Sequence, residues 1–237
     1  MEEIRSMLVV TGSHDPLLDE VADLMRHRWS GSLVGSSHVG SMGGIMALRR
    51  SEAHLGGIHL LDEASGAYNI TYVQKYFPQG GVVLVECVQR TQGLMVAKGN
   101  PKNIRGFADL AELEFVNRQK GSGTRILFDH LAGQVGMNLD SLRGYNREEF
   151  THTAVAAAIA AGTADAGLGI LAAAKIYDLD FIPVADEQYD LLIAEEALEL
   201  ETVQQFLEIL QSQAFADRLE KLGGYTLRNP GRIIKWH

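Results

Sequence analysis

The stretch that decides the fold is residues 7–28, which read "MLVVTGSHDPLLDEVADLMRHR". Its first six residues form a nearly continuous apolar run, which predicts a buried strand. Pro16 is well placed for the first position of a helix, and apolar residues then recur at helical spacing from Leu17 to Met25. The stretch therefore predicts a strand, a short polar loop and an amphipathic helix.

This β-loop-α unit recurs along the chain. The strand segments and the helical segments that go with them are "SLVGSS" (32–37) with "GGIMALRRSEAHL" (43–55), "IHLLD" (58–62) with "NITYVQKYF" (69–77), "EFVNRQ" (114–119) with "TRILFDHLAGQV" (124–135), and the helix "AVAAAIAAG" (154–162) with the strand "AGLGI" (166–170). Such alternation is typical of an α/β protein with a parallel or mixed sheet, whose ligands bind at the carboxyl ends of the strands.

Two long β-rich segments interrupt the alternation. Residues 81–101 and 180–198 are extended segments without a helical pattern, which we interpret as two hinge crossings between two lobes. We expect residues 1–88 and 195–237 to form the first lobe and residues 89–194 the second, with a ligand cleft between them. Amphipathic helices over 201–212 and 214–225 should close the first lobe, with Gly223 and Gly224 as the stop signal.

The composition excludes several classes of protein. The 237 residues are 46% hydrophobic and 22% charged, as in ordinary globular domains. A net charge of -9, without a stripe of Lys and Arg, argues against direct binding of nucleic acid. No run is long enough to span a bilayer and no export signal is visible, so we expect no membrane partner and a cytoplasmic protein. The single cysteine, Cys87, lies in an apolar run and is expected to be buried.

Four loops combine glycines and hydroxyl residues at the predicted starts of helices. They are "TGSHDP" (11–16), "GSSHVGSMGG" (35–44), "KGSGTR" (120–125) and "FTHTAV" (150–155). A helix N-terminus offers unpaired N–H groups and a positive dipole end, so it suits an anion, although each loop alone could simply cap its helix. Two loops fall in each predicted lobe, so together they predict an oxyanion held between the lobes.

Three segments carry a resemblance to a known family. The runs "GSMGGIMALRRSEAHLGGIHLLD" (40–62), "NRQKGSGTR" (117–125) and "THTAVAAAIAAGTADAGLGI" (151–170) resemble the domain of the type II periplasmic-binding-protein superfamily found in molybdenum-related proteins. The resemblance covers about Leu8 to Tyr225. That domain occurs alone, behind winged-helix regulators as a LysR-like substrate-binding domain, or fused to molybdopterin-biosynthesis proteins. The resemblance implies a two-lobed fold that binds molybdate or tungstate, with no resident cofactor.

The family pattern also implies which residues hold the ligand. The implied ligand-binding residues are Ser13, Ser41, Ser122, Gly123, Thr124, Arg125, Thr153 and Ala154. We expect Arg125 to be the most informative, because a guanidinium offers paired donors and a permanent charge to a tetrahedral dianion. Arg118 and Lys120 are weaker candidates, since charged residues that flank a loop are more often solvated.

Other chemistries have weaker support. His14, His38 and His152 lie in the loops, but no metal-binding motif such as H-E-x-x-H or C-x-x-C accompanies them, so we predict no metal site. The common hydrolase and nucleotide-binding motifs are also absent from the sequence, and Asp165 is expected to orient a loop rather than to catalyse. We find no catalytic constellation and expect a binding protein rather than an enzyme.

The expected function is intracellular binding or sensing of a small oxyanion, most simply molybdate or tungstate, through closure of two lobes. A regulator or a protein of molybdenum-cofactor synthesis is the expected partner. Two alternatives stay open: an accessory protein of molybdenum-cofactor synthesis that binds a pterin-linked intermediate, and a sensor of a small organic anion. A small site lined by hydroxyl groups would favour the oxyanion, and a larger site with an aromatic wall would favour the pterin-linked intermediate.

Overall fold

The structure is a computed structural model that describes residues 7–234 of the chain. The α-helices and β-strands of these residues, in chain order, are β1 (Leu8–Gly12), α2 (Pro16–Arg28), β2 (Val34–His38), α3 (Gly40–Arg49), β3 (Leu55–Ile58), α4 (Ile70–Tyr76), β4 (Val82–Val96), β5 (Asn117–Arg118), α5 (Gly123–Gln134), β6 (Glu148–Glu149), α6 (His152–Ala160), β7 (Ala166–Ile170), α7 (Leu171–Ile176), β8 (Asp180–Ala194), α8 (Glu201–Leu210), α9 (Gln213–Leu222), β9 (Tyr225–Thr226) and β10 (Ile233–Ile234). In the described part of the chain, no helix has the length and apolar character needed to cross a membrane.

The strands form a mixed sheet. Strand β1 lies between β2 and β3 and runs parallel to both. Strand β3 pairs antiparallel with β8, β8 with β4, and β4 with β7. The short strands β5 and β6 make a separate parallel pair. The predicted α/β fold is therefore confirmed. Because β1, β2 and β3 run parallel, their carboxyl ends lie at the same edge of the sheet.

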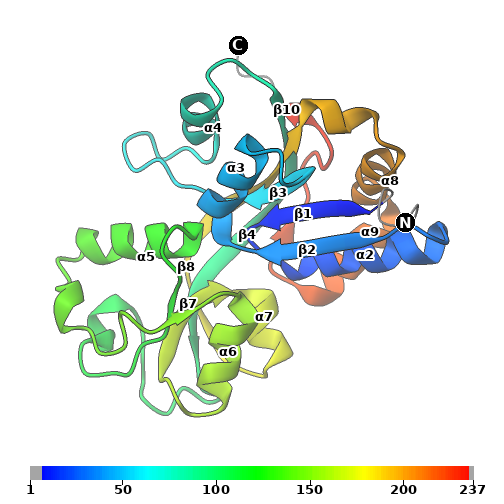
Figure 1. Ribbon diagram of the computed structural model, residues 1–237. Helices are drawn as coiled ribbons and strands as arrows, with labels where there is room; N and C mark the ends of the chain where they lie inside the picture. Colours follow the sequence, from blue (N-terminus) through cyan, green and yellow to red (C-terminus); the bar gives the residue numbers. More distant parts are fainter. Residues whose placement is uncertain (1–6, 235–237) are drawn as a thin grey trace.

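Strands β4 and β8 are the two predicted crossings. Figure 1 shows that they run through two groups of elements, a first group with β1, β2, β3, α2, α3, α4, α8 and α9 and a second group with α5, α6, α7 and β7. They pair antiparallel from Val82↔Ala194 to Val96↔Asp180, with register shifts between Glu86 and Val88 and between Gln92 and Gly93. The hydrogen-bonded sheet is thus continuous from one group to the other through these two strands. The two groups are linked by paired strands rather than by a loose linker.

The hydrophobic cores follow the same division. One group holds two cores, built around α2, α8 and α9 on one side of the sheet and around α3 and α4 on the other. The other group has a core under α5 and a second core under α6 and α7. Cys87 is buried in the first of these cores, as predicted.

The lobe boundaries at 88/89 and 194/195 stay a prediction, and residues 1–6 and 235–237 of the predicted first lobe lie outside the described residues. Tyr189, Leu191 and Ile193 of β8 pack into a core of the first group. We therefore propose that the return crossing changes lobes several residues before 194.

The third predicted unit differs in detail from the observed one. The strand is Leu55–Ile58 rather than residues 58–62, and the preceding helix ends at Arg49. Ser51 has a φ of 55°, a left-handed conformation that ends the helical path. Gly56 and Gly57 lie in this strand at positions where neighbouring atoms leave no room for a side chain. A Cβ on Gly56 would come within 2.2 Å of the Thr11 carbonyl oxygen, and a Cβ on Gly57 within 1.8 Å of the Tyr189 hydroxyl. These glycines permit close packing instead of making a turn.

Candidate functional site

A cluster of buried polar side chains lies where the two groups of elements meet. Ser13 follows β1 and His59 follows β3, both at the carboxyl ends of parallel strands. Arg118 ends β5, and His152 begins α6 after β6. All four residues are buried, with at most 1% of their surface exposed. The carboxyl ends of strands from both groups therefore converge, which is where ligands bind in α/β proteins.

Ser13, His59 and Glu187 form a hydrogen-bonded chain at the centre of this cluster. The Ser13 Oγ atom lies 2.8 Å from His59 Nε2, and His59 Nδ1 lies 2.8 Å from Glu187 Oε2. A serine hydroxyl, an imidazole and a carboxylate linked in this order also form the catalytic triads of hydrolases. Here, however, the Glu187 carboxylate is shared with Gln92, whose Nε2 donates to it at 2.8 Å, and with Arg90.

Arg90 is a buried cation whose charge is fully compensated. Its Nε donates to Glu187 at 2.5 Å, its Nη1 contacts the Asp15 carboxylate, and its guanidinium stacks 4.5 Å from the centre of the Tyr189 ring. Burial opposes the charge, but Glu187 and Asp15 raise the pKa of Arg90 above its usual range. Arg90 therefore anchors the crossing strands and holds the pKa of Glu187 below its usual range against the effect of burial.

Arg118 is a buried cation without such compensation. Its Nε lies 3.2 Å from both Gln119 Oε1 and the Glu149 carbonyl, and its Nη2 donates to the Phe150 carbonyl at 3.0 Å. All these acceptors are neutral, and among the described residues no carboxylate lies within ion-pair distance of Arg118. Burial, followed by the charge of Arg90, lowers the pKa of Arg118 to about 9. Arg118 therefore stays cationic at neutral pH and lacks an anionic partner.

Several buried polar atoms around Arg118 make no hydrogen bond in the described part of the chain. They are Nη1 of Arg118 itself, Nε2 of Gln119, Nδ1 of His14, Nη2 of Arg90, Oε1 of Gln92, both ring nitrogens of His152, and Nε of Arg125, which lies in an ion pair with Asp129 but makes no hydrogen bond. Most of these atoms are donors. Buried polar groups are rarely left unpaired in proteins, so such a group of donors indicates a binding site for an acceptor-rich molecule.

His152 reports the positive character of this region. Burial, then Arg118, Arg90 and His59, lower the pKa of His152 well below its ordinary value. Burial is also the main cause that lowers the pKa of His38 and of His59, and Arg118 contributes to both as the smallest cause. Three histidines from different parts of the chain are thus kept neutral mainly by burial, and the charge of Arg118, which an anion would neutralise, adds to this in each.

The two groups of elements are in direct contact beside this cluster. The N–H of Met42, in the first turn of α3, donates to the Gly121 carbonyl in the loop before α5 at 3.2 Å. A Cβ on Gly40 would lie 3.3 Å from Gln119 Nε2, and a Cβ on Gly123 would lie 2.1 Å from the His59 carbonyl oxygen. The N-terminus of α3 therefore meets the loop before α5 at Gly40 and Gly121, and a side chain at position 123 would push α5 away from His59, after β3.

Five of the sequence-predicted residues come together here. Ser41 Oγ accepts a hydrogen bond from the His59 N–H at 3.2 Å, which places it beside Ser13. Thr124 Oγ1 accepts from Gln92 Nε2 at 2.9 Å, and Ser122 Oγ caps α5 by accepting from the Arg125 N–H at 3.1 Å. Gly123 is the residue packed against His59.

Arg125 lies in different surroundings from those expected. Its guanidinium stacks 4.0 Å from the Tyr145 ring centre, with Nε 3.3 Å from Asp129 and Nη1 3.7 Å from Glu148. Its Nη1 also donates to the Arg118 carbonyl at 3.2 Å. The charge of Arg125 is thus already paired within its own group of elements, whereas that of Arg118 is not.

Thr153 and Ala154 lie in the first turn of α6. The cap of this helix is Thr151, whose Oγ1 accepts from the Ala154 N–H at 3.0 Å and lies 3.0 Å from Thr153 Oγ1. The Ala154 N–H is therefore used by the cap. The neighbouring His152, with its two unpaired ring nitrogens, is the residue of this turn with unused hydrogen-bonding capacity.

Sequence reasoning missed Arg90, Glu187 and Gln92 as site residues. Charged residues interrupt both crossings, but Arg90 and Glu187 are only two of several, so the sequence does not single them out. The antiparallel register places Arg90 directly opposite Glu187. That register brings together residues far apart in sequence, and no local pattern reveals it.

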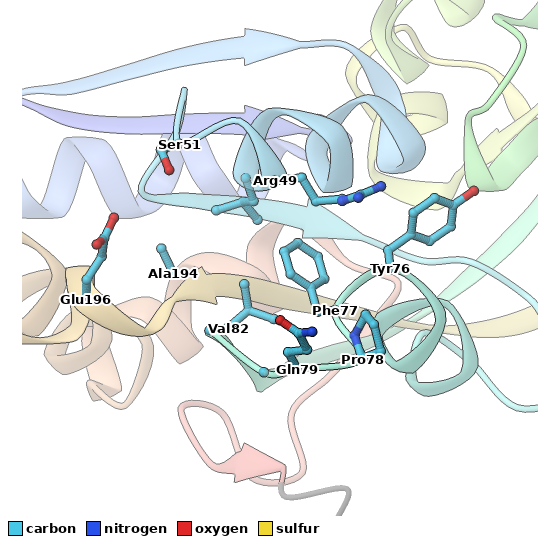
Figure 2. Close-up of a pocket in the computed structure, with 12 residues that line it drawn as sticks. Arg49, Ser51, Tyr76, Phe77, Pro78, Gln79, Val82, Ala194 and Glu196 are labelled. Atoms are coloured by element: carbon cyan, nitrogen blue, oxygen red, sulfur yellow. The ribbon is translucent and has the colours of Figure 1, made fainter.

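A surface pocket of about 510 Å³ lies elsewhere on the first group of elements (Figure 2). Arg49, Tyr76, Phe77 and Glu196 are among its lining residues. It is at the C-terminal end of α3, whereas the polar cluster is at the N-terminal end of this ten-residue helix, roughly 13 Å away at 1.5 Å per residue. None of the unpaired buried atoms belongs to its lining residues, so it is separate from the candidate site.

Comparison with known proteins identifies the family of the chain. A family model described as a PBP superfamily domain matches residues 22–211. The uncharacterized protein YvgK of Bacillus subtilis (strain 168) is 36% identical over 197 residues, which are 82% of this chain and 63% of YvgK. The match thus spans less than two thirds of that relative's length.

Solved structures with the same fold include binding proteins and a regulator. A substrate-binding protein assigned to a phosphate ABC transporter of Clostridium perfringens, with phosphate bound, gives a TM-score of 0.70 at 15% identity and covers 94% of this chain and 100% of its own. A substrate-binding domain assigned to a molybdenum ABC transporter of Clostridium difficile gives 0.59 at 11% identity, covering 92% and 97%. CbnR, a LysR family transcriptional regulator, gives 0.56 at 15% identity, covering 86% and 68%. At these identities the likeness shows the two-lobed fold alone, as predicted.

Proposed function

We propose that this chain, which belongs to the PBP superfamily, binds a small oxyanion between its two lobes, with molybdate or tungstate as the ligand. The observation that carries the proposal is Arg118, a buried guanidinium without an acidic partner among the described residues. A buried charge is costly unless it is paired, so the site is suited to a ligand that brings negative charge. A tetrahedral dianion also accepts many hydrogen bonds, which the donors around Arg118 can supply.

The hydroxyl groups support the same proposal. Ser41, Ser122 and Thr124 each use their oxygen as an acceptor inside the protein. A hydroxyl that accepts such a bond still has its own hydrogen to donate. Three neutral donors beside one cation would replace the hydration shell of a small oxyanion, and the N-terminus of α5 adds the positive end of its dipole.

The contact between the lobes favours a small ligand over a large one. The N-terminus of α3 already touches the loop before α5 at Met42 and Gly121, and the residue after β3, His59, touches the start of α5 at Gly123. A pterin-linked intermediate would require these contacts to separate. We propose that closure around the ion is the signal, read by a regulator or a protein of molybdenum-cofactor synthesis inside the cell. Fractionation of native cells checks the cellular compartment.

The test is a calorimetric titration of the purified chain with molybdate, tungstate, sulfate and phosphate, and with a small organic phosphate as a further arm. We expect sulfate and phosphate to bind at least tenfold more weakly than molybdate or tungstate, a difference of about 1.4 kcal/mol. A protonated anion presents a donor to the donors of the site, which weakens phosphate. Equal affinities for all four ions would contradict the proposal, and preference for the organic phosphate would favour the organic-anion alternative.

A further inference from the structure

The Ser13 hydroxyl differs from the other hydroxyls of the site. Ser41, Ser122 and Thr124 accept hydrogen bonds from N–H groups and keep their own hydrogen free. The partner of Ser13 Oγ is instead the Nε2 atom of His59, at 2.8 Å. An imidazole nitrogen can donate or accept, depending on its protonation. What Ser13 can offer to a ligand is therefore decided by His59.

Glu187 fixes the tautomer of His59. Burial opposes ionisation of this carboxyl group, but Arg90, His59 and Gln92 hold the pKa of Glu187 at about 2. An ionised carboxylate can only accept, so His59 Nδ1, 2.8 Å away, must carry the hydrogen of that bond. In neutral His59, Nε2 is then an acceptor and takes the single hydrogen of Ser13. In this state Ser13 can only accept a hydrogen bond from a ligand.

Protonation of His59 reverses this arrangement. With both ring nitrogens protonated, Nδ1 still donates to Glu187, and Nε2 now donates to Ser13 Oγ. The hydrogen of Ser13 is released and can be donated to an oxyanion. No side chain has to move, since both hydrogen bonds keep their partners and only the direction of one of them changes.

The charges around His59 decide which state prevails. The titratable groups that face it are Glu187 and Tyr189 on β8, Arg90 on β4, Arg118 on β5 and His152 on α6. Burial lowers the pKa of His59, Arg90 and Arg118 lower it further, and Glu187 opposes them. Unliganded His59 is therefore neutral at neutral pH. An oxyanion beside Arg118 adds negative charge and raises this pKa.

We infer that His59 takes up a proton when the site binds a fully deprotonated oxyanion, and that this proton turns Ser13 from an acceptor into a donor to the ligand. The inference rests on the proposed function and adds a linkage between binding and pH. Affinity for such an anion rises as the pH falls through the pKa of His59 in the complex, and levels off below its pKa in the free protein.

The experiment is calorimetry of molybdate binding to the full chain at about pH 7.5, where molybdate carries no proton, in buffers with different ionisation enthalpies. The dependence of the observed enthalpy on the buffer gives the protons taken up per ion. We expect uptake of up to about one proton. Molybdate binding without proton uptake overturns the inference and leaves the proposed function standing, whereas no binding of any oxyanion removes both.

Two variants identify the group that receives the proton. His59→Gln should abolish the uptake, and His152→Asn, which changes the neighbouring histidine with a ring centroid 6.4 Å from His59, should retain it. If His152→Asn loses the proton uptake while His59→Gln retains it, the proton belongs to His152 and the inference is overturned. The ¹⁵N chemical shifts of the His59 ring, recorded in the wild-type chain with and without molybdate, give the answer even if His59→Gln does not fold.

Discussion

The sharpest prediction compares two arginines in the same segment, Arg118 and Arg125. Each is replaced by glutamine, which removes the charge and keeps a hydrogen-bonding group. Both side chains are buried, at 1% and 4% exposure, so a difference between the variants cannot come from burial. Arg118 has neutral acceptors as partners, and Arg125 has Asp129, Glu148 and the Tyr145 ring.

For Arg118→Gln we expect a large loss of affinity with little loss of stability. Charge-assisted hydrogen bonds contribute about 1.5–3 kcal/mol, so molybdate affinity should fall roughly tenfold to more than a hundredfold. The lost hydrogen bonds to neutral acceptors cost about 0.5–1.5 kcal/mol each. Removal of an uncompensated buried charge offsets this by several kcal/mol. The free energy of unfolding of the unliganded protein should therefore change by less than about 2 kcal/mol.

For Arg125→Gln we expect the opposite. Its ion pairs involve part-exposed carboxylates and contribute modestly, and the stacking on Tyr145 adds about 0.5–2 kcal/mol. The free energy of unfolding should fall by about 1–3 kcal/mol, while molybdate affinity stays within about twofold.

Calorimetric titration with molybdate measures the affinities, and urea unfolding without ligand measures the stabilities. If Arg125→Gln abolishes binding while Arg118→Gln binds normally, the family pattern chose the correct arginine and our assignment of Arg118 is wrong.

Two further predictions concern closure and pH. Gly123→Ala places a methyl group against the His59 carbonyl oxygen and should weaken molybdate binding more than tenfold by keeping the lobes apart. The control is Gly133→Ala in the same helix, which has open space around its Cβ and should bind molybdate normally. Normal binding by both variants would show that the close contact between Gly123 and His59 does not accompany ligand binding. Burial and Arg118 hold the pKa of His152 well below about 6.5, so the unfolded chain binds more protons and the free energy of unfolding should decrease as the pH falls below that value. His152→Asn should make this decrease shallower in urea unfolding between about pH 7.5 and 5, and identical slopes for variant and wild type would count against a buried neutral His152.

Local sequence determined many of the elements of this protein, although not the bounds of α3 and β3. The pattern of residues 7–28 predicted β1 and α2, and Pro16 is the first residue of that helix. The two crossings were visible as β4 and β8, and Gly223 ends α9 with a φ of 77°. These features depend on apolar periodicity and on caps within a few residues, which are written in the chain itself.

Local sequence also pointed to loops whose residues lie at the polar cluster, but a ligand-binding loop and a helix cap use the same residue types, so their role as ligand-binding loops stays a prediction. Ser122 shows why its role could not be predicted further. Its Oγ caps α5 by accepting from the Arg125 N–H, and the residue also lies beside the polar cluster. Ser122 therefore fits both a helix cap and a ligand-binding loop.

Tertiary structure alone decided which charges are paired. Arg118 and Arg125 lie in one loop segment, yet the pairing of β5 with β6 surrounds Arg118 with the Glu149 and Phe150 carbonyls, whereas α5 carries Arg125 to Asp129 and Tyr145. His59 meets Glu187 across 128 positions of sequence. Whether a buried charge is compensated depends on neighbours brought together by folding, so the sequence could name the arginines but could not choose between them.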